Sequence, residues 1–275
     1  MRVVKESRAP RAAAGTRPRA LILATVGVAV LGVGLVAAGV AAALVAPATD
    51  TAAASNAAER AAAERATVQP EPAELPEADL ATPDGAGISA LAADWWVTET
   101  AARYGIPERA LAAYAGAAMR VSSEHPECGL DWTTLAGIGH VESGHGTIDS
   151  GTIDGTGQQQ PAIVGIALDG GDTHAIGDTD GGALDGDAVW DRAVGPMQLI
   201  PETWGQYASD GNDDGASDPQ QIDDAALTAA RYLCAVGVDL RTSDGWIAAI
   251  SAYNDTVDYN NRVADATSYY RSSGT

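Results

Sequence analysis

The chain has 275 residues and a formal net charge of −21, and 46% of it is hydrophobic. This length allows one domain of about 180 residues plus a segment without a core of its own. Six of the 16 bases lie within the first 20 residues, which leaves 10 bases against 36 of the 37 acids beyond them. Such an acidic surface repels nucleic acid and anionic lipid, so we exclude nucleic acid as a partner; neutral sugars and cations are compatible with it.

An uncharged and mostly apolar run, 21–46, follows a basic segment, 1–20. As a helix it reaches about 39 Å, enough to cross a bilayer. Because basic flanks stay in the cytoplasm, we predict a transmembrane anchor with a cytoplasmic N-terminus and everything after residue 47 outside the cell. The alternative is a cleaved signal segment and a secreted protein, although the apolar core of a signal is shorter, about 7 to 15 residues.

The next stretch, 47–90, is rich in Ala, Pro and Glu and lacks the apolar periodicity that a core requires. Its prolines favour extended conformations. We therefore predict a disordered linker that holds a folded domain, 91–275, away from the membrane.

Helical periodicity predicts most elements of the folded part. The first two helices are expected over 88–104, ending at Gly105, and after Pro107. A third helix starts at Trp132 and ends at Gly144 and Gly146. A long Gly- and Asp-rich loop insertion, 147–188, precedes a loop that runs into a short helix within 189–207, and further helices are expected over 222–236, 246–253 and 259–270. No alternating strand pattern is present, so the predicted fold is mainly α.

The helix that begins at Trp132 carries a single carboxylate, Glu142, on its apolar face. Leu135, Ile138 and Glu142 are spaced by three and four residues, so they share one side of the helix. Burial raises the pKa of a carboxyl and yields a proton donor near neutral pH, as a general acid requires. The alternative is an ordinary helix-end glutamate in water. A zinc site is set aside because the zinc-protease motif has its two histidines four residues apart, whereas His140 and His145 are five residues apart.

Cys128 and Cys234 are the only cysteines of the chain. Both follow the predicted anchor and would face an oxidising compartment, which favours a disulfide between them. Two free buried thiols are the alternative.

Three motifs in order resemble the lytic murein transglycosylases, and most of all the membrane-bound lytic transglycosylase B group of actinobacteria. They are LAGIGHVESGHG at 135–146, AVGPMQLIP at 193–201 and AYN at 252–254. The resemblance implies a lysozyme-like, goose-type helical domain that acts on peptidoglycan. It also implies cleavage of the MurNAc-β-1,4-GlcNAc bond with 1,6-anhydroMurNAc ends, with Glu142 as acid and then base.

The resemblance also implies which residues bind the sugars. Ser143 would sit beside the acid, and Gly195, Met197 and Gln198 would form the groove wall. Tyr253 and Asn254 would hydrogen-bond the acid or the N-acetyl group. Core packing is the alternative for Met197, and a helix-end aromatic is the alternative for Tyr253. Leu199 departs from the pattern, since many relatives carry an aromatic residue there.

No second carboxylate is evident in the sequence, although glycosidases usually need two. In the transglycosylases the N-acetyl group and the C6 hydroxyl of the sugar replace it, so no cofactor is required. The competing functions are a hydrolytic muramidase, which would use a second acid, and a non-catalytic peptidoglycan-binding module.

A second pattern, Asp210-Gly-Asn212-Asp213-Asp214-Gly215, matches positions 1, 3, 5 and 6 of an EF-hand calcium loop. Position 12 is Gln221, which lacks the usual carboxylate, and the resemblance suggests Asp224 as its substitute. The predicted ligands of a structural calcium are thus Asp210, Asn212, Asp214 and Asp224. A solvated turn is the alternative, and turn chemistry likewise explains the acids between 178 and 187.

Overall fold

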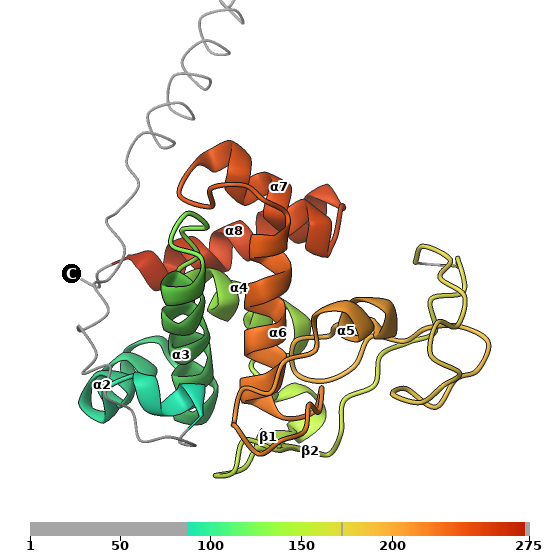
Figure 1. Cartoon of the computed structure of the whole chain (residues 1–275), viewed down its shortest axis with the longest axis horizontal. Helices are drawn as coiled ribbons and strands as arrows, with labels where there is room; N and C mark the ends of the chain where they lie inside the picture. Colours follow the sequence, from blue (N-terminus) through green and yellow to red (C-terminus); the bar gives the residue numbers. More distant parts are fainter. Residues whose placement is uncertain (1–86, 172, 273–275) are drawn as a thin grey trace, which may run out of the picture. The chain divides into compact units, whose positions relative to one another are not determined.

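The computed structural model describes residues 87–171 and 173–272 (Figure 1). The predicted basic segment, anchor and nearly all of the predicted linker lie outside the described residues. Within the described part, no helix is both long and apolar enough to cross a membrane.

The described residues form seven α-helices, which confirms the predicted mainly α fold. The α-helices are α2 (Asp94–Tyr104), α3 (Glu108–Glu124), α4 (Trp132–Ser143), α5 (Pro201–Tyr207), α6 (Ile222–Ala235), α7 (Ser243–Tyr253) and α8 (Val257–Arg271). Two short 3-10 helices, η1 (Ile88–Leu91) and η2 (Ile148–Ser150), and two strands, β1 (Thr152–Ile153) and β2 (Gln159–Gln160), complete the elements.

Helix α4 lies at the centre of the core and packs against α3, α6 and α8. The core almost completely buries its side chains Trp132, Leu135 and Ile138. Glycine is required where α3 crosses, because a Cβ on Gly139 would lie 2.2 Å from the hydroxyl of Tyr114. Every residue of α4 from Trp132 to Gly139 is buried, and this packing fixes the position of the helix that carries Glu142 near its C-terminal end.

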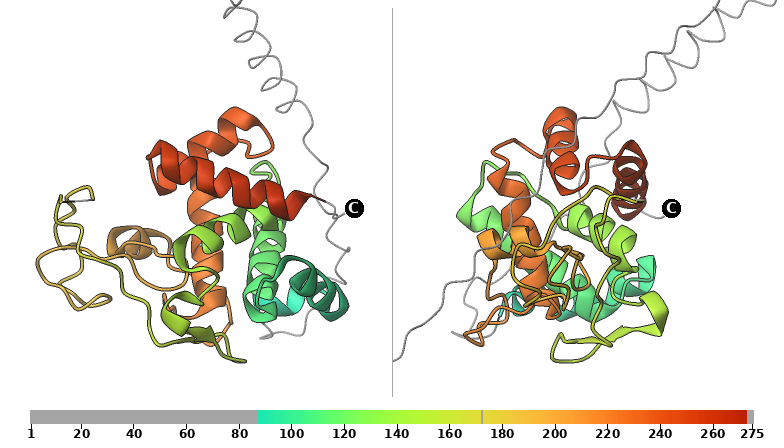
Figure 2. Two further views of the ribbon diagram at one scale, coloured as in Figure 1. Left: turned by 180° about the vertical axis from the view of Figure 1, so that it is seen from behind. Right: turned by 90° about the vertical axis from the view of Figure 1, so that its right-hand side faces the viewer.

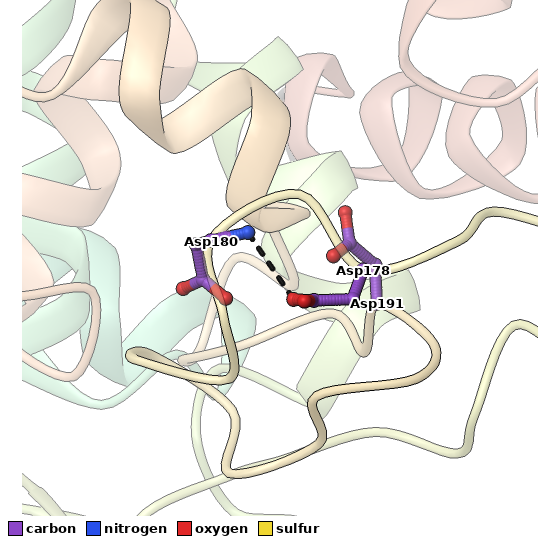
Figure 3. A group of neighbouring side chains, drawn as sticks. All are labelled: Asp178, Asp180 and Asp191. Atoms are coloured by element: carbon purple, nitrogen blue, oxygen red, sulfur yellow. Dashed lines mark hydrogen bonds between the residues drawn. The ribbon is translucent and has the colours of Figure 1, made fainter. Parts of the chain in front are cut away.

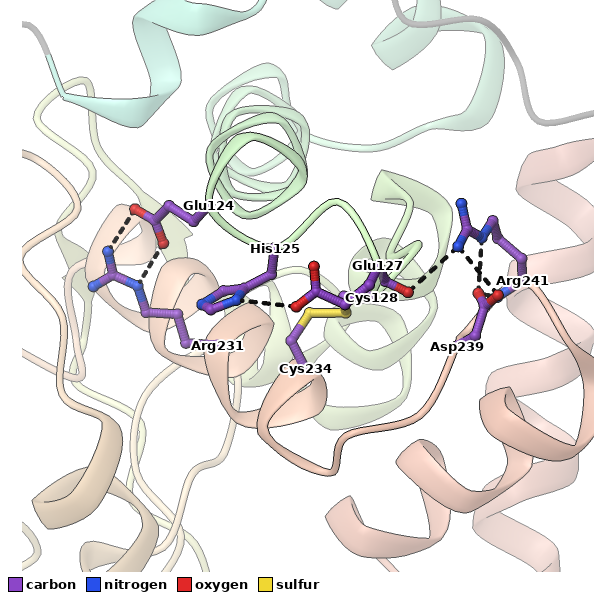
Figure 4. Close-up of a disulfide and its surroundings, with 8 residues drawn as sticks. All are labelled: Glu124, His125, Glu127, Cys128, Arg231, Cys234, Asp239 and Arg241. Atoms are coloured by element: carbon purple, nitrogen blue, oxygen red, sulfur yellow. Dashed lines mark hydrogen bonds and ion pairs between the residues drawn. A yellow bond between two sulfur atoms is a disulfide. The ribbon is translucent and has the colours of Figure 1, made fainter.

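A disulfide joins Cys128 and Cys234, as predicted, with their Cα atoms 5.4 Å apart (Figure 4). It links the segment after α3 to the last turn of α6. An ion pair between Glu124 and Arg231, 2.8 Å long, connects the same two helices nearby. These links hold α3 and α6, both neighbours of α4, in fixed relation.

The prediction of a single helix over 88–104 is wrong, because the helical conformation is interrupted between η1 and α2. Ala92 and Ala93 are extended, with ψ of 135° and 130°. Ile88 is fully buried, η1 packs against α3, and the Ile88 amide donates to the carbonyl of Gly211 over 2.8 Å. These tertiary contacts override the helical periodicity. They also show that the folded part includes Ile88–Leu91, of which residues 88–90 fell within the predicted linker range.

The long insertion is mostly loop, as predicted, but it contains a small antiparallel ladder that the sequence pattern did not reveal. Thr152 pairs with Gln160 and Ile153 with Gln159. Strands of two residues are too short for a detectable alternation. Figure 2 shows the rest of the insertion, in yellow, to one side of the helices.

Candidate active site

Glu142 lies one residue before the end of α4 and is half-buried. Burial raises the pKa of its carboxyl to about 7, while a hydrogen bond from Tyr259 and the positive charge of Arg262 act in the opposite direction. The hydroxyl of Tyr259 donates to Glu142 Oε1 over 2.6 Å. The predicted general acid therefore has a pKa near neutrality, as its assigned chemistry requires.

Two tyrosines form a wall beside the carboxyl. Tyr259 lies in the first turn of α8, and its ring stacks on that of Tyr253, with centroids 6.5 Å apart. Burial, and then the charge of Glu142, raise the pKa of Tyr253, so its hydroxyl stays protonated. That hydroxyl donates to the carbonyl of Met197 over 2.6 Å, which ties the end of α7 to the turn at 195–198.

The turn at 195–198 is shaped by close contacts. Gly195 has a φ of 75°, and a Cβ there would lie 1.8 Å from the carbonyl oxygen of Pro219. Gln198 also has a positive φ, 47°, and its side-chain amide donates back to the carbonyl of Gly195 over 2.9 Å. Only glycine fits the first of these positions, which explains why it belongs to the motif.

Ser143 connects this turn to α4. Its hydroxyl donates to the carbonyl of Pro196 over 2.7 Å and accepts the amide of Gly146 over 2.8 Å. The side chain is buried. Ser143 thus supports the position of Glu142 relative to the turn, rather than exposing a hydroxyl to a sugar.

The other predicted sugar-binding residues differ in their exposure. Met197 is fully buried, so the packing alternative describes its side chain. Asn254 is exposed, and its Oδ1 accepts from the amide and the hydroxyl of Thr256 at 3.1 and 2.9 Å, not from a group on Glu142. Gln198 is half-exposed. The structure therefore brings Glu142, Ser143, Tyr253 and the turn at 195–198 together. The side chain of Asn254 is exposed and bonds to Thr256 instead.

Sequence reasoning missed Tyr259 and Arg262 as site residues. Tyr259 was assigned only to the last helix, and Arg262 was not considered. Both follow the AYN motif by less than three helical turns, and this proximity was the available signal. No carboxylate in the described part of the chain is among the groups that shift the pKa of Glu142.

The predicted calcium ligands lie in a loop whose oxygens are hydrogen-bonded to its own backbone. Asp210 accepts the amides of Asp214 and Gly215 at 3.1 and 2.8 Å. Asp224 is buried, and its carboxylate accepts the amides of Gly211 and Asp218 at 2.7 and 2.9 Å. Hard oxygens on alternate residues suit Ca²⁺, so the donor set fits the ion, and calcium binding stays a prediction.

Among the described residues, one group of three carboxylates has oxygens within 4.8 Å of one another: Asp178, Asp180 and Asp191 (Figure 3). Asp178 accepts the amides of Gly181 and Gly182 at 2.9 and 3.1 Å. Asp191 accepts the amide and hydroxyl of Thr179 at 2.9 and 2.8 Å. Turn hydrogen bonds therefore account for this cluster, as the sequence pattern indicated for Asp178 and Asp180; Asp191 was not part of that prediction.

Comparison with known families finds a similarity over about a third of the chain. Residues 178–271 match the family model of the transglycosylase SLT domain. The matched segment contains the turn at 195–198 and the two tyrosines, and it begins after Glu142. An SLT domain implies the lytic transglycosylase family, cleavage of glycosidic bonds and peptidoglycan as the substrate. No curated protein and no solved structure matches the chain.

Proposed function

We propose that the protein is a lytic transglycosylase that cleaves the MurNAc-β-1,4-GlcNAc bond of peptidoglycan and leaves 1,6-anhydroMurNAc ends. Glu142 is the general acid and base. The observation that carries this proposal is the half-buried carboxyl with a pKa of about 7, which Tyr259 holds beside the turn of the SLT segment.

The reaction needs one group that gives a proton and then takes one. Glu142 donates its proton to the glycosidic oxygen, which leaves on GlcNAc as the bond to C1 of MurNAc breaks. The N-acetyl group stabilises the positive charge at C1. Glu142 then removes the proton of the C6 hydroxyl as O6 bonds to C1, which regenerates the acid.

Tyr259 orients the carboxyl for both steps. Its hydrogen bond engages Oε1, and Oε2 accepts no hydrogen bond from the described residues, so Oε2 can face the substrate. The same bond favours the charged form, which keeps the pKa from rising further. A hydrolytic muramidase would need a second carboxylate about 5 to 9.5 Å away.

The finer assignments belong to the same proposal. The three motifs support the transglycosylase B group and a lysozyme-like arrangement of the helices. The apolar run 21–46 would anchor the chain in the membrane, with the domain outside and facing the cell wall. Fractionation of cells that express the full chain tests this, since a soluble product shortened by about 46 residues would indicate a cleaved signal instead.

Digestion of purified peptidoglycan tests the function. The full chain and its Glu142→Gln variant are incubated with the polymer, and the released fragments are analysed by mass spectrometry. We expect anhydro ends from the unaltered chain and none from the variant. Reducing ends would instead indicate a muramidase, and binding without release would indicate a binding module.

A further inference from the structure

A cavity of about 370 Å³ lies beside the C-terminal part of α4, the helix that carries the proposed acid. It lies between the end of α2, α4 and α8, and none of the residues of the turn at 195–198 lines it. Val141, next to Glu142 in the chain, and Arg262, three residues after Tyr259, belong to its wall. The cavity is therefore lined by the two helices that carry Glu142 and Tyr259, but by neither of these two side chains.

The cavity has an aromatic floor. Tyr104, Tyr269 and Tyr270 line it, and the rings of Tyr104 and Tyr270 meet edge to face with centroids 5.6 Å apart. Beneath them, His145 is buried and shares a hydrogen bond of 2.9 Å with the hydroxyl of Tyr270. Tyr269 is 55% exposed, so its ring can cover the aliphatic part of a bound ligand.

Arg262 supplies to this cavity a positive charge that no ion pair with a described residue neutralises. Five of the eight arginines in the described part of the chain form ion pairs with carboxylates: Arg109, Arg192, Arg231, Arg241 and Arg271. Arg262 is exposed and, within the described residues, has neither an ion pair nor a hydrogen bond, not even with Asp265, which lines the same cavity. A guanidinium left free in so acidic a protein can bind an incoming carboxylate through two hydrogen bonds.

We infer that this cavity binds the peptide stem of peptidoglycan, with Arg262 on a stem carboxylate, Asp265 facing an ammonium group and the tyrosines under the aliphatic parts. The inference rests on the proposed function, since it names a further part of the same substrate. Geometry supports it, because the stem is attached to the MurNAc ring whose glycosidic bond breaks. A substituent of that ring needs a site beside the acid and off the glycan path.

The cavity suits a neutral sugar less well than a peptide stem. Stacking on a tyrosine suits a sugar ring, but paired charges of opposite sign suit a ligand that carries both. A peptide stem carries carboxylates and, in many cell walls, an amino group as well. The predicted consequence is a preference for strands that carry stems.

Two substrates separate this site from the catalytic step. The full chain is assayed on glycan strands with stems and on strands stripped of stems by an amidase, and the ratio of the two kcat/KM values is compared between variants. Any effect of Arg262 on Glu142 acts on both substrates and cancels in the ratio. We expect Arg262→Gln to lower the ratio about tenfold, the loss of a charge-assisted contact. The matched control Arg120→Gln, on α3 and outside the cavity, should keep it.

Calorimetry with a soluble stem peptide and the full chain gives a readout that is independent of cleavage. We expect binding that Arg262→Gln weakens about tenfold. If no strand is cleaved but this binding and its loss are observed, the proposed function fails and the site stands. If strands are cleaved while the ratio is unchanged in Arg262→Gln, or the variant loses binding of stripped glycan equally, the peptide site is overturned.

Discussion

Two carboxyl groups of this protein, the half-buried Glu142 at the end of α4 and the buried Asp224 in α6, are held in opposite ways. Glu142 accepts one hydrogen bond, from the hydroxyl of Tyr259. Asp224 accepts backbone amides on both of its oxygens and ties the acidic loop to α6. Burial raises both pKa values, to about 7 for Glu142 and about 6 for Asp224.

The difference separates a carboxyl that can take part in a reaction from one that supports the structure. Backbone amides engage both oxygens of Asp224, whereas Glu142 keeps an oxygen that the described residues do not engage. In the loop insertion, Asp178, Asp180 and Asp187 also accept amides of their own turns, Asp178 on one oxygen only. A buried carboxyl with few partners is the better sign of a catalytic group.

We expect the largest effect on stability from breaking the disulfide, because it belongs to the helical framework that holds Glu142 in place. Reducing the bond between Cys128 and Cys234 removes a cross-link over 106 residues, which contributes up to about 4.7 kcal/mol on the chain-entropy account. We expect a lower melting temperature. Thiol titration of the unfolded, unreduced protein should find no free thiol, and two would contradict the bond.

Removing the carboxyl itself comes next. Glu142→Gln should keep the fold and glycan binding but lower kcat by a factor on the order of 100 or more, since an amide cannot donate and recover the proton. Glu99→Gln, an exposed acid on α2, serves as the control and should keep its activity. Undiminished turnover in Glu142→Gln would remove the role assigned here.

Calcium binding would test the structural role of Asp224 and the acidic loop. If Asp210, Asn212, Asp214 and Asp224 bind one ion, calcium at a hundredfold excess over its dissociation constant stabilises the fold by about 2.7 kcal/mol. Melting curves with calcium and with chelator measure this. Asp214→Ala should abolish the rise and leave the chemistry of Glu142 largely intact, and coincident curves for the unaltered chain would mean a solvated turn.

Tyr259→Phe probes the single hydrogen bond of the acid. The bond favours the charged carboxylate, so its loss should raise the pKa of Glu142 further and move the alkaline limb of the pH profile to higher pH. We also expect kcat to fall about tenfold, as for one hydrogen bond to a charged group. Tyr207→Phe is a matched control outside the site. An unmoved pH profile would contradict the effect assigned to Tyr259 on the pKa of Glu142.

Much of this arrangement could be predicted from local patterns. The spacing of Leu135, Ile138 and Glu142 located the acid on a buried helix, and the cysteine count located the disulfide. Tyr259 and Arg262 were missed because their closeness to the AYN motif is a weak signal, and their role depends on where α8 packs against α4. The break before α2 was missed for the same reason, since the contacts of Ile88 with α3 and Gly211 are tertiary.

The most direct test of the account is the pKa of the Glu142 carboxyl, measured by carbon NMR with Glu142→Gln to assign the resonance. We expect a midpoint of about 7, well above the ordinary value of 4.5. The folded protein then binds this proton more tightly than the unfolded chain, so the stability that the proton contributes is complete below about pH 4.5 and is lost as the pH rises through about 7. A midpoint near 4.5 would mean an ordinary helix-end glutamate and would contradict the proposed general acid.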